Sequence, residues 1–242
     1  YFSETGQLWG NPLYAWDEHR RTGFAWWISR LASTLKLVDL VRMDHFRGFE
    51  ACWRIPADAD TAINGRWVPA PGEALFQALQ DEFGTLPVVA EDLGLITPAV
   101  RRLRERFGFP GMRVLQFAFD GGADNPYLPH NHEVNSVVYT GTHDNDTTLA
   151  WFESLPVEQQ RVVLDYLGHP REPMPWPLLR AALASVAQLV ILPMQDVLQL
   201  GSGHRMNIPG SHSGNWQWRL EWSDVPPGLA DRLRHLLRVY GR

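Results

Sequence analysis

The sequence predicts an α/β fold built on a parallel β-sheet, and two observations lead to this prediction. Short apolar segments alternate with longer segments of helical periodicity, which is the order of parallel strands joined by crossover helices. Each apolar segment ends in polar residues, as expected where a buried parallel strand leaves the sheet. Five predicted strands are too few to close an eight-stranded barrel, so the pattern fits either an open doubly wound sheet or the later part of a (β/α)8 barrel.

Apolar runs and turn residues locate the individual elements along the chain. Strands are predicted at 37–44, 86–90, 112–119, 135–140 and 190–194. Helices are predicted at 16–35, 73–83, 98–107, 147–155, 157–167, 178–188 and 229–240. Loops rich in glycine or proline are predicted at 1–16, 52–71 and 201–215.

Several helix ends have a specific local cause. Thr97 followed by Pro98 predicts an N-cap with proline in the first helical position. Gly84 suits the end of the helix before it, because glycine tolerates the left-handed backbone there. Pro156 separates two helical segments that would otherwise read as one.

The composition narrows the class of protein. Hydrophobic residues make up 45% and charged residues 20% of the chain, which is typical of a globular domain. A net charge of −5 does not favour nucleic acid or an anionic membrane as a partner. The single cysteine, Cys52, excludes an internal disulfide, and we expect a cytoplasmic protein. Neither the dinucleotide nor the phosphate-loop glycine fingerprint occurs, so no cofactor is expected.

Three acidic residues follow three predicted strands: Asp44, Glu91 and Asp144. Because the ends of parallel strands meet at one edge of a sheet, these acids are expected to share a site. Glycoside chemistry needs one carboxylate that attacks the sugar and one carboxylic acid that protonates the leaving oxygen. Arg42 lies two residues before Asp44, so on a strand both side chains point to the same side and Asp44 stays ionised.

Other interpretations of these residues are open at this point. Arg42 and Asp44 could form a purely structural pair. Asp92 could matter instead of Glu91, and Asp144 could be a turn residue. His45 and His143 stand beside the acids, but no HExxH or CxxC pattern occurs, so metal catalysis is not expected.

Six segments together resemble the 4-α-glucanotransferases, also called amylomaltases or disproportionating enzymes, which form glycoside hydrolase family 77. The segments are G-Q-L-W-G-N-P-L-Y (6–14), V-R-M-D-H-F-R-G (41–48), V-V-A-E-D-L-G (88–94), G-F-P-G-M-R-V-L-Q-F-A-F (108–119), T-G-T-H-D-N-D-T (140–147) and S-G-N-W-Q-W-R (213–219). The resemblance implies that residues 1–242 are the C-terminal portion of a catalytic (β/α)8 TIM barrel, with about five strand–helix units. The first strands and any N-terminal insertions would then precede the chain.

The resemblance also implies roles for particular residues. Asp44 would be the nucleophile, Glu91 the acid/base, and Asp144 the third carboxylate, which stabilises the oxocarbenium-like state. Arg42 would fix Asp44 and keep it ionised. The residues implied to bind sugar are Arg42, His143, Gln7, Trp9, Phe117, Asp120 and Asn215.

The expected partners are an α-1,4-glucan donor, a sugar acceptor and the missing N-terminal part of the same enzyme. Without that part the chain is expected to be poorly active or inactive. Two other functions fit the same residues. One is an α-glucan hydrolase with the same carboxylates. The other is a non-catalytic glucan-binding fragment that uses some of the 11 tryptophans.

Overall fold

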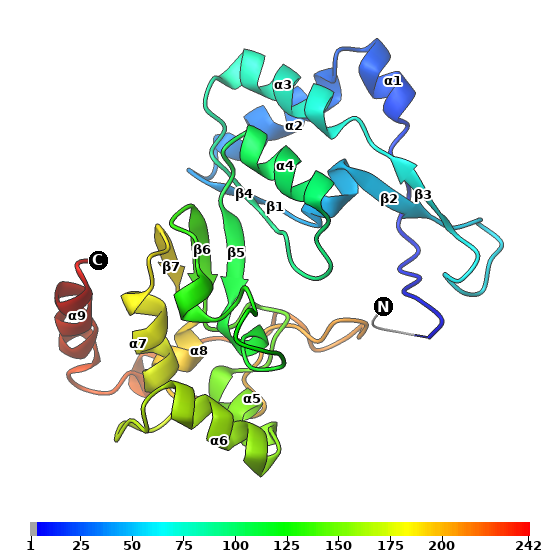
Figure 1. Cartoon of the computed structure of the whole chain (residues 1–242). Coiled ribbons are helices and arrows are strands. Elements are labelled where there is room, and N and C mark those ends of the chain that lie inside the picture. The colour runs from blue at the N-terminus through cyan, green and yellow to red at the C-terminus, as the bar shows by residue number, and fades with distance from the viewer. Residues whose placement is uncertain (1–3) are drawn as a thin grey trace. The chain divides into compact units, whose positions relative to one another are not determined.

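The protein is an α/β chain that divides into two compact units at Gly111 (Figure 1). The computed structural model describes residues 4–242, so the first three residues of the predicted loop 1–16 lie outside the described part. Three strand pairs of the main sheet, β1–β4, β4–β5 and β6–β7, run parallel, which confirms the predicted class. In the described part of the chain, no helix is both long enough and apolar enough to cross a membrane.

The first unit combines parallel strands with helices and one antiparallel hairpin. Its elements are α1 (Trp16–Arg21), α2 (Ala25–Leu35), β1 (Val41–Met43), a 3-10 helix (Phe46–Phe49), β2 (Ala51–Arg54), β3 (Arg66–Pro69), α3 (Gly72–Phe83), β4 (Val88–Ala90) and α4 (Pro98–Arg106). β1 pairs with β4 in the register Val41↔Val88, Arg42↔Val89 and Met43↔Ala90. β4 pairs in turn with the first residue of β5.

The core of the first unit is rich in aromatic side chains. Phe46, Phe76 and Phe109 are all buried, and their rings lie within 5.1–6.0 Å of one another. All three residues of β4 are buried, so this strand is covered on both faces. A fully buried phenylalanine or valine contributes about 1.5–3 kcal/mol of apolar transfer free energy, so this packing fixes the strand from which Glu91 projects.

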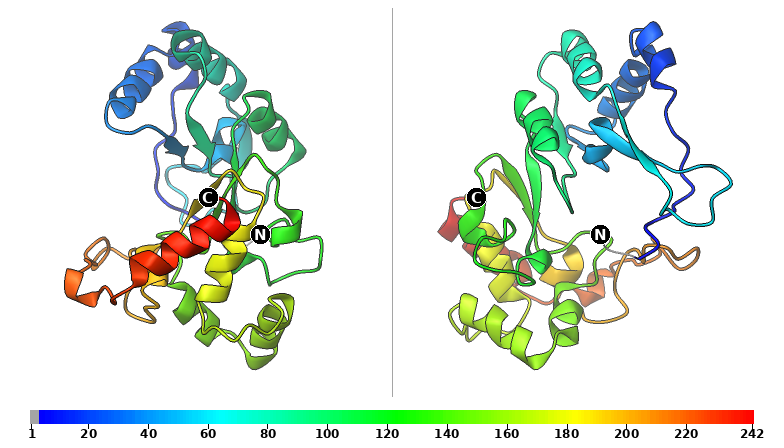
Figure 2. Two further views of the ribbon diagram at one scale, coloured as in Figure 1. Left: turned by 90° about the vertical axis from the view of Figure 1, so that its left-hand side faces the viewer. Right: turned by 45° about the vertical axis from the view of Figure 1, so that its right-hand side comes forward.

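The second unit has the same α/β character. Its elements are the remainder of β5 (Gly111–Val114), two 3-10 helices (Leu115–Phe117 and Pro129–Asn131), β6 (Ser136–Tyr139), α5 (Thr148–Ser154), α6 (Val157–Tyr166), α7 (Trp176–Ala184), β7 (Leu189–Ile191), α8 (Met194–Val197), a third 3-10 helix (Trp222–Asp224) and α9 (Leu229–Tyr240). Its strands follow the order β5-β6-β7. The last helix, α9, packs against α7 (Figure 2), where Leu229 and Leu236 join a cluster with Trp176.

Three predictions in the first half of the chain were wrong in detail. The strand expected over 37–44 is only β1 (Val41–Met43), since the chain before it is turn and Leu37 is 84% exposed. The single helix expected over 16–35 is two helices, because Gly23 and Phe24 both have left-handed backbone, with φ of 60° and 58°. The loop expected over 52–71 contains the hairpin β2–β3, in which Trp53 pairs with Trp67 across the strands at 5.4 Å. Pro56 lies in the connection between the two strands, Pro69 is the last residue of β3, and Pro71 precedes α3.

Three element boundaries in the second half also differ from the prediction. The apolar run 112–119 leaves the sheet after Val114 and continues as a buried 3-10 helix, since an apolar run alone does not distinguish these forms. The helix expected over 178–188 is α7, which begins at Trp176 and ends at Ala184, where Ser185 has extended backbone. The last strand begins at Leu189, and Met194 starts α8 instead of ending the strand.

Candidate active site

The exits of β1 and β4 bring two of the predicted carboxylates to adjacent positions. The strand register continues by one residue, so that Asp44 follows β1 where Glu91 follows β4. The backbone holds this alignment, because the Glu91 N–H donates to the Met43 carbonyl at 3.0 Å and the Phe46 N–H donates to the Glu91 carbonyl at 3.0 Å. Neighbouring strands lie about 4.8 Å apart, so side chains at adjacent strand exits can reach the roughly 5–5.5 Å that separates the carboxyl groups of a retaining glycosidase.

Arg42 contacts Asp44 as the sequence predicted. Its guanidinium Nη2 donates to Asp44 Oδ1 at 2.9 Å. The Asp44 side chain is 79% exposed, whereas the Arg42 side chain is 28% exposed. The half-buried arginine therefore orients a carboxylate that remains open to solvent, as a nucleophile requires.

Glu91 is partly buried and carries a strongly shifted pKa. Burial raises the pKa of the Glu91 carboxyl to about 7, and the nearby Asp44 charge adds to the rise. Two backbone amides oppose it: the His45 N–H donates to Oε2 at 2.6 Å and the Leu93 N–H donates to Oε1 at 3.2 Å. A carboxyl group of this pKa exchanges its proton near neutral pH, which suits a general acid/base.

Asp92, the alternative to Glu91, has a structural environment. Its side chain is 6% exposed and forms an ion pair with Arg104 at 3.2 Å, itself 5% exposed. A Cβ atom at Gly111 would lie 2.2 Å from Arg104 Nη1, so only glycine leaves room for this pair. Because both charges are buried and paired with each other, Asp92 is not accessible to a sugar.

The second unit holds Asp144 in a turn after β6. Asn207 Nδ2 donates to Asp144 Oδ1 at 2.6 Å, and His143 Nε2 lies 3.4 Å from Oδ2. Arg205 Nη2 donates to the Asp144 carbonyl at 2.7 Å. Two neighbours therefore orient the carboxylate and Arg205 holds the backbone, while the Asp144 side chain remains 46% exposed.

Asn215 and Trp216, at the end of the glycine-rich loop 201–215, have different roles near this cluster. The Trp216 ring lies 5.0 Å from the His143 ring and limits its orientation. The Asn215 side chain bonds within its own loop: its Oδ1 accepts from the Ile208 N–H at 2.9 Å and from the Ser211 hydroxyl at 3.2 Å. Asn215 therefore shapes the loop that carries Asn207.

The remaining predicted sugar-binding residues lie in exposed or partly exposed segments. Asp120 Oδ1 accepts from Asn125 Nδ2 at 3.0 Å, and the Phe117 ring packs edge-on against a tyrosine at 5.6 Å. Gln7 and Trp9 belong to the exposed segment before α1, where the Trp9 ring is 59% exposed. The sugar contacts of these four residues remain predictions.

The structure thus brings Arg42, Asp44 and Glu91 together in the first unit and His143 and Asp144 together in the second. The sequence analysis missed Arg205 and Asn207, which orient Asp144. Their only sequence signal is a run of hydrogen-bond donors inside a glycine-rich loop. Within residues 4–242, no group of three or more histidine, cysteine, aspartate or glutamate side chains is arranged to hold a metal ion.

Comparisons with known proteins agree with the resemblance found in the sequence. The family model described as 4-alpha-glucanotransferase, glycoside hydrolase family 77, matches residues 1–224. The whole chain aligns with 50% of the 4-alpha-glucanotransferase of Thermus thermophilus, at 56% identity over 250 residues. It aligns with 48% of the corresponding protein of Synechocystis sp., at 53% identity over 245 residues.

A solved structure has the same fold as this chain. The amylomaltase from Streptococcus agalactiae, determined in complex with acarbose, superposes with a TM-score of 0.95 and 42% identity. The match covers 100% of this chain and 49% of the amylomaltase. The chain therefore spans about half the length of the relatives that it matches.

Proposed function

The chain belongs to glycoside hydrolase family 77, the 4-alpha-glucanotransferase family, and we propose that it carries the catalytic carboxylates of a retaining 4-α-glucanotransferase. The enzyme would move α-1,4-glucan segments between maltooligosaccharides or starch. The observation that carries this proposal is the β1–β4 register, with the Arg42–Asp44 pair at one strand exit and Glu91 at the next.

In the proposed architecture, residues 1–242 form the C-terminal portion of a (β/α)8 barrel. The repeated parallel strand–helix order supports it, and so does the coverage of only 50% and 48% of two relatives. The upstream polypeptide, with the first strands and any N-terminal insertions, is then the partner that completes the enzyme. The cytoplasmic location stays a prediction.

In the proposed first step, the Asp44 carboxylate attacks the anomeric carbon of the donor glucan while the glycosidic C–O bond breaks. Glu91 gives its proton to the departing oxygen, so the leaving chain ends in a 4-hydroxyl group. The product is a glucosyl ester of Asp44. The raised pKa of Glu91, about 7, keeps a large fraction of this carboxyl protonated at neutral pH.

In the proposed second step, the Glu91 carboxylate removes the proton from the 4-hydroxyl of an acceptor sugar. The acceptor oxygen attacks the anomeric carbon, the ester bond to Asp44 breaks, and the stereochemistry is retained after two inversions. Asp144 would hold hydroxyl groups of the reacting sugar and stabilise its positive charge. His143, held beside Trp216, would donate to a further hydroxyl.

The other proposed sugar contacts would determine whether an acceptor sugar or water reaches the glucosyl ester. Trp9, with its ring 59% exposed, offers a face on which a sugar can stack, and Gln7 would lie beside it as a hydrogen-bonding group. Phe117, Asp120 and Asn215 are proposed as outer contacts.

The test compares this chain alone, an N-terminal half taken from a relative, and the two mixed. Each sample is incubated with maltotriose, and longer maltooligosaccharides and new reducing ends are measured. We expect longer products from the mixture and little or none from either part. New reducing ends without longer products would show a hydrolase. No product, together with glucan binding that survives Glu91→Gln, would show a non-catalytic binding fragment.

A further inference from the structure

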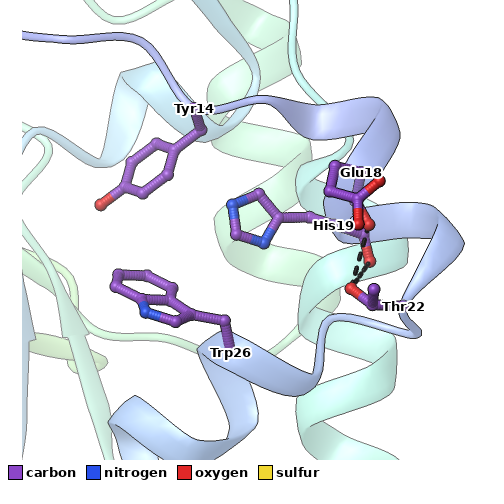
Figure 3. A pocket seen from close by; sticks show the side chains of 5 residues that line it. All are labelled: Tyr14, Glu18, His19, Thr22 and Trp26. Atoms are coloured by element: carbon purple, nitrogen blue, oxygen red, sulfur yellow. Dashed lines mark hydrogen bonds between the residues drawn. The ribbon is translucent and has the colours of Figure 1, made fainter.

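A cavity in the first unit lies apart from the proposed catalytic residues. It has a volume of about 410 Å³ and is lined by five side chains: Tyr14, Glu18, His19, Thr22 and Trp26 (Figure 3). They come from α1, α2 and the segments that flank α1. None of them is among the proposed catalytic or sugar-contact residues. The volume lies within the range of about 300–1,000 Å³ that is typical of small-ligand sites.

Aromatic rings form the apolar walls of this cavity. Tyr14 and Trp26 are 41% and 50% exposed, and their ring centroids lie 6.0 Å apart at 53°. The His19 ring projects between them, 5.7 Å from Tyr14 and 5.8 Å from Trp26 (Figure 3). The walls are supported from behind, since Tyr14 also lies 5.0 Å from the buried Trp27 and Arg30 donates to its hydroxyl at 3.0 Å.

Polar groups complete the lining. The Glu18 carboxylate accepts two hydrogen bonds from Arg21, at 2.6 and 2.9 Å, so its orientation is fixed. The Arg21 guanidinium lowers the pKa of Glu18, which keeps this carboxylate an acceptor at neutral pH. The Thr22 hydroxyl donates to the Glu18 carbonyl at 3.0 Å and retains its own lone pairs for a ligand.

The charge of the lining restricts the class of ligand. No lysine or arginine lines the cavity, and one carboxylate does. Arg21 is already paired with this carboxylate, so the lining leaves no uncommitted lysine or arginine to bind a phosphate or another anion. A neutral ligand with one apolar face and several hydroxyl groups suits both the rings and the acceptors.

We propose that this cavity is a second glucan-binding site, separate from the carboxylates that carry out the transfer. The inference rests on the proposed function, because that function supplies the ligand class. Because the Arg30 guanidinium lies over the Trp26 ring, 5.3 Å from its centroid, a glucose unit would lay its C–H face on the other side of this ring and direct hydroxyl groups toward Glu18 and Thr22. A long chain held at this point has a raised local concentration near the enzyme, so starch would benefit more than maltotriose.

The test uses NMR of the Glu91→Gln form of this chain, which prevents turnover, with maltoheptaose as the probe. The Trp26 indole N–H signal is expected to shift as maltoheptaose is added, and Trp26→Ala is expected to weaken binding by about tenfold or more. Trp26→Tyr should restore most of the affinity, because it keeps an aromatic face. Trp222→Ala is the matched control, since Trp222 is 85% exposed and lies in the second unit.

Two results would overturn the proposal. One is an unmoved Trp26 signal, or equal affinities of Trp26→Ala and Trp222→Ala, with circular dichroism showing that both variants are folded. The other is a Trp26 signal that shifts on addition of the N-terminal half and then no longer responds to maltoheptaose, which would make this surface a contact between the two parts. Transfer from maltotriose is assayed separately, so failure of the proposed function leaves the Trp26 response as an independent result.

Discussion

Two carboxyl groups, the partly buried Glu91 in the first unit and the fully buried Asp196 in the second, have different surroundings. Burial raises the pKa of both. Asp196 is 1% exposed and accepts from the Thr140 hydroxyl at 2.5 Å, the Thr148 hydroxyl at 2.6 Å and the Thr148 N–H at 2.7 Å. Glu91 accepts from two backbone amides only and remains partly exposed beside Asp44.

The comparison separates a structural acid from a candidate catalytic one. Asp196 ties β6, α5 and α8 together, and its oxygens have no room for a sugar. The pKa of Glu91 is raised as well, but its side chain stays partly exposed and lies one strand away from an oriented carboxylate. A raised pKa alone therefore does not identify an acid/base; accessibility and a second carboxylate in register do.

The largest expected effect separates the two acids by activity. Glu91→Gln should lower kcat/KM for maltotriose by about 10²–10⁴-fold in the chain complemented with an N-terminal half, because general acid–base catalysis is lost. Asp196→Asn should change kcat/KM per folded molecule by less than about tenfold. A larger loss of activity in folded Asp196→Asn than in Glu91→Gln would reverse the assignment.

For the stability of the fold, we expect the substitution of Asp196 to have the large destabilising effect. Asp196→Asn should lower the free energy of unfolding by about 2–4 kcal/mol, because an amide in this position cannot accept from all three donors. Urea denaturation followed by circular dichroism measures it. Asp17→Asn is the control, since the Asp17 side chain is fully exposed, and we expect it to change stability by less than about 0.5 kcal/mol. Equal midpoints for the two variants would contradict the structural role of Asp196.

The pH dependence of stability tests whether the pKa of Glu91 is raised in the folded chain. Its pKa in the folded chain, about 7, lies above the usual 4.5. The folded state therefore binds this proton more tightly, so the contribution of Glu91 to stability is full below about pH 4.5 and falls as the pH rises to about 7. Glu91→Gln should stabilise the chain by about 1–2 kcal/mol at about pH 8, because a neutral amide replaces a buried charge. The amide accepts less well from the two N–H donors, which limits this gain. At about pH 4.5 the substitution should have little effect. Denaturation at both pH values checks this, and an equal change at both would contradict it.

The smallest expected effect concerns the residue that orients Asp144. Asn207→Ala removes the hydrogen bond to Asp144 Oδ1 and should lower kcat/KM for maltotriose by about tenfold, with unchanged stability. Asn131→Ala is the matched control, because Asn131 donates to backbone carbonyls of its own loop. Equal kinetics for the two variants would show that Asp144 needs no such support.

The sequence was sufficient for the class of fold and for the pairing of Arg42 with Asp44. The periodicity of hydrophobic residues and the polar residues after each strand are local properties of the sequence, and the structure confirms most of the elements that they predict. The sequence was insufficient where tertiary contacts decide. The β2–β3 hairpin depends on Trp53 meeting Trp67, and the 3-10 helix after Val114 depends on packing that an apolar run does not reveal. Asn207 was missed because it lies 63 residues from the aspartate that it contacts.

The central claim is that Glu91 is a proton donor near neutral pH because it is buried beside Asp44. The most direct measurement is the ¹³C NMR titration of the Glu91 side-chain carboxyl in this chain, assigned by comparison with Glu91→Gln. We expect a midpoint near pH 7, because burial raises the pKa of Glu91 to about 7. A midpoint at the ordinary glutamate value, about 4.3, would contradict it.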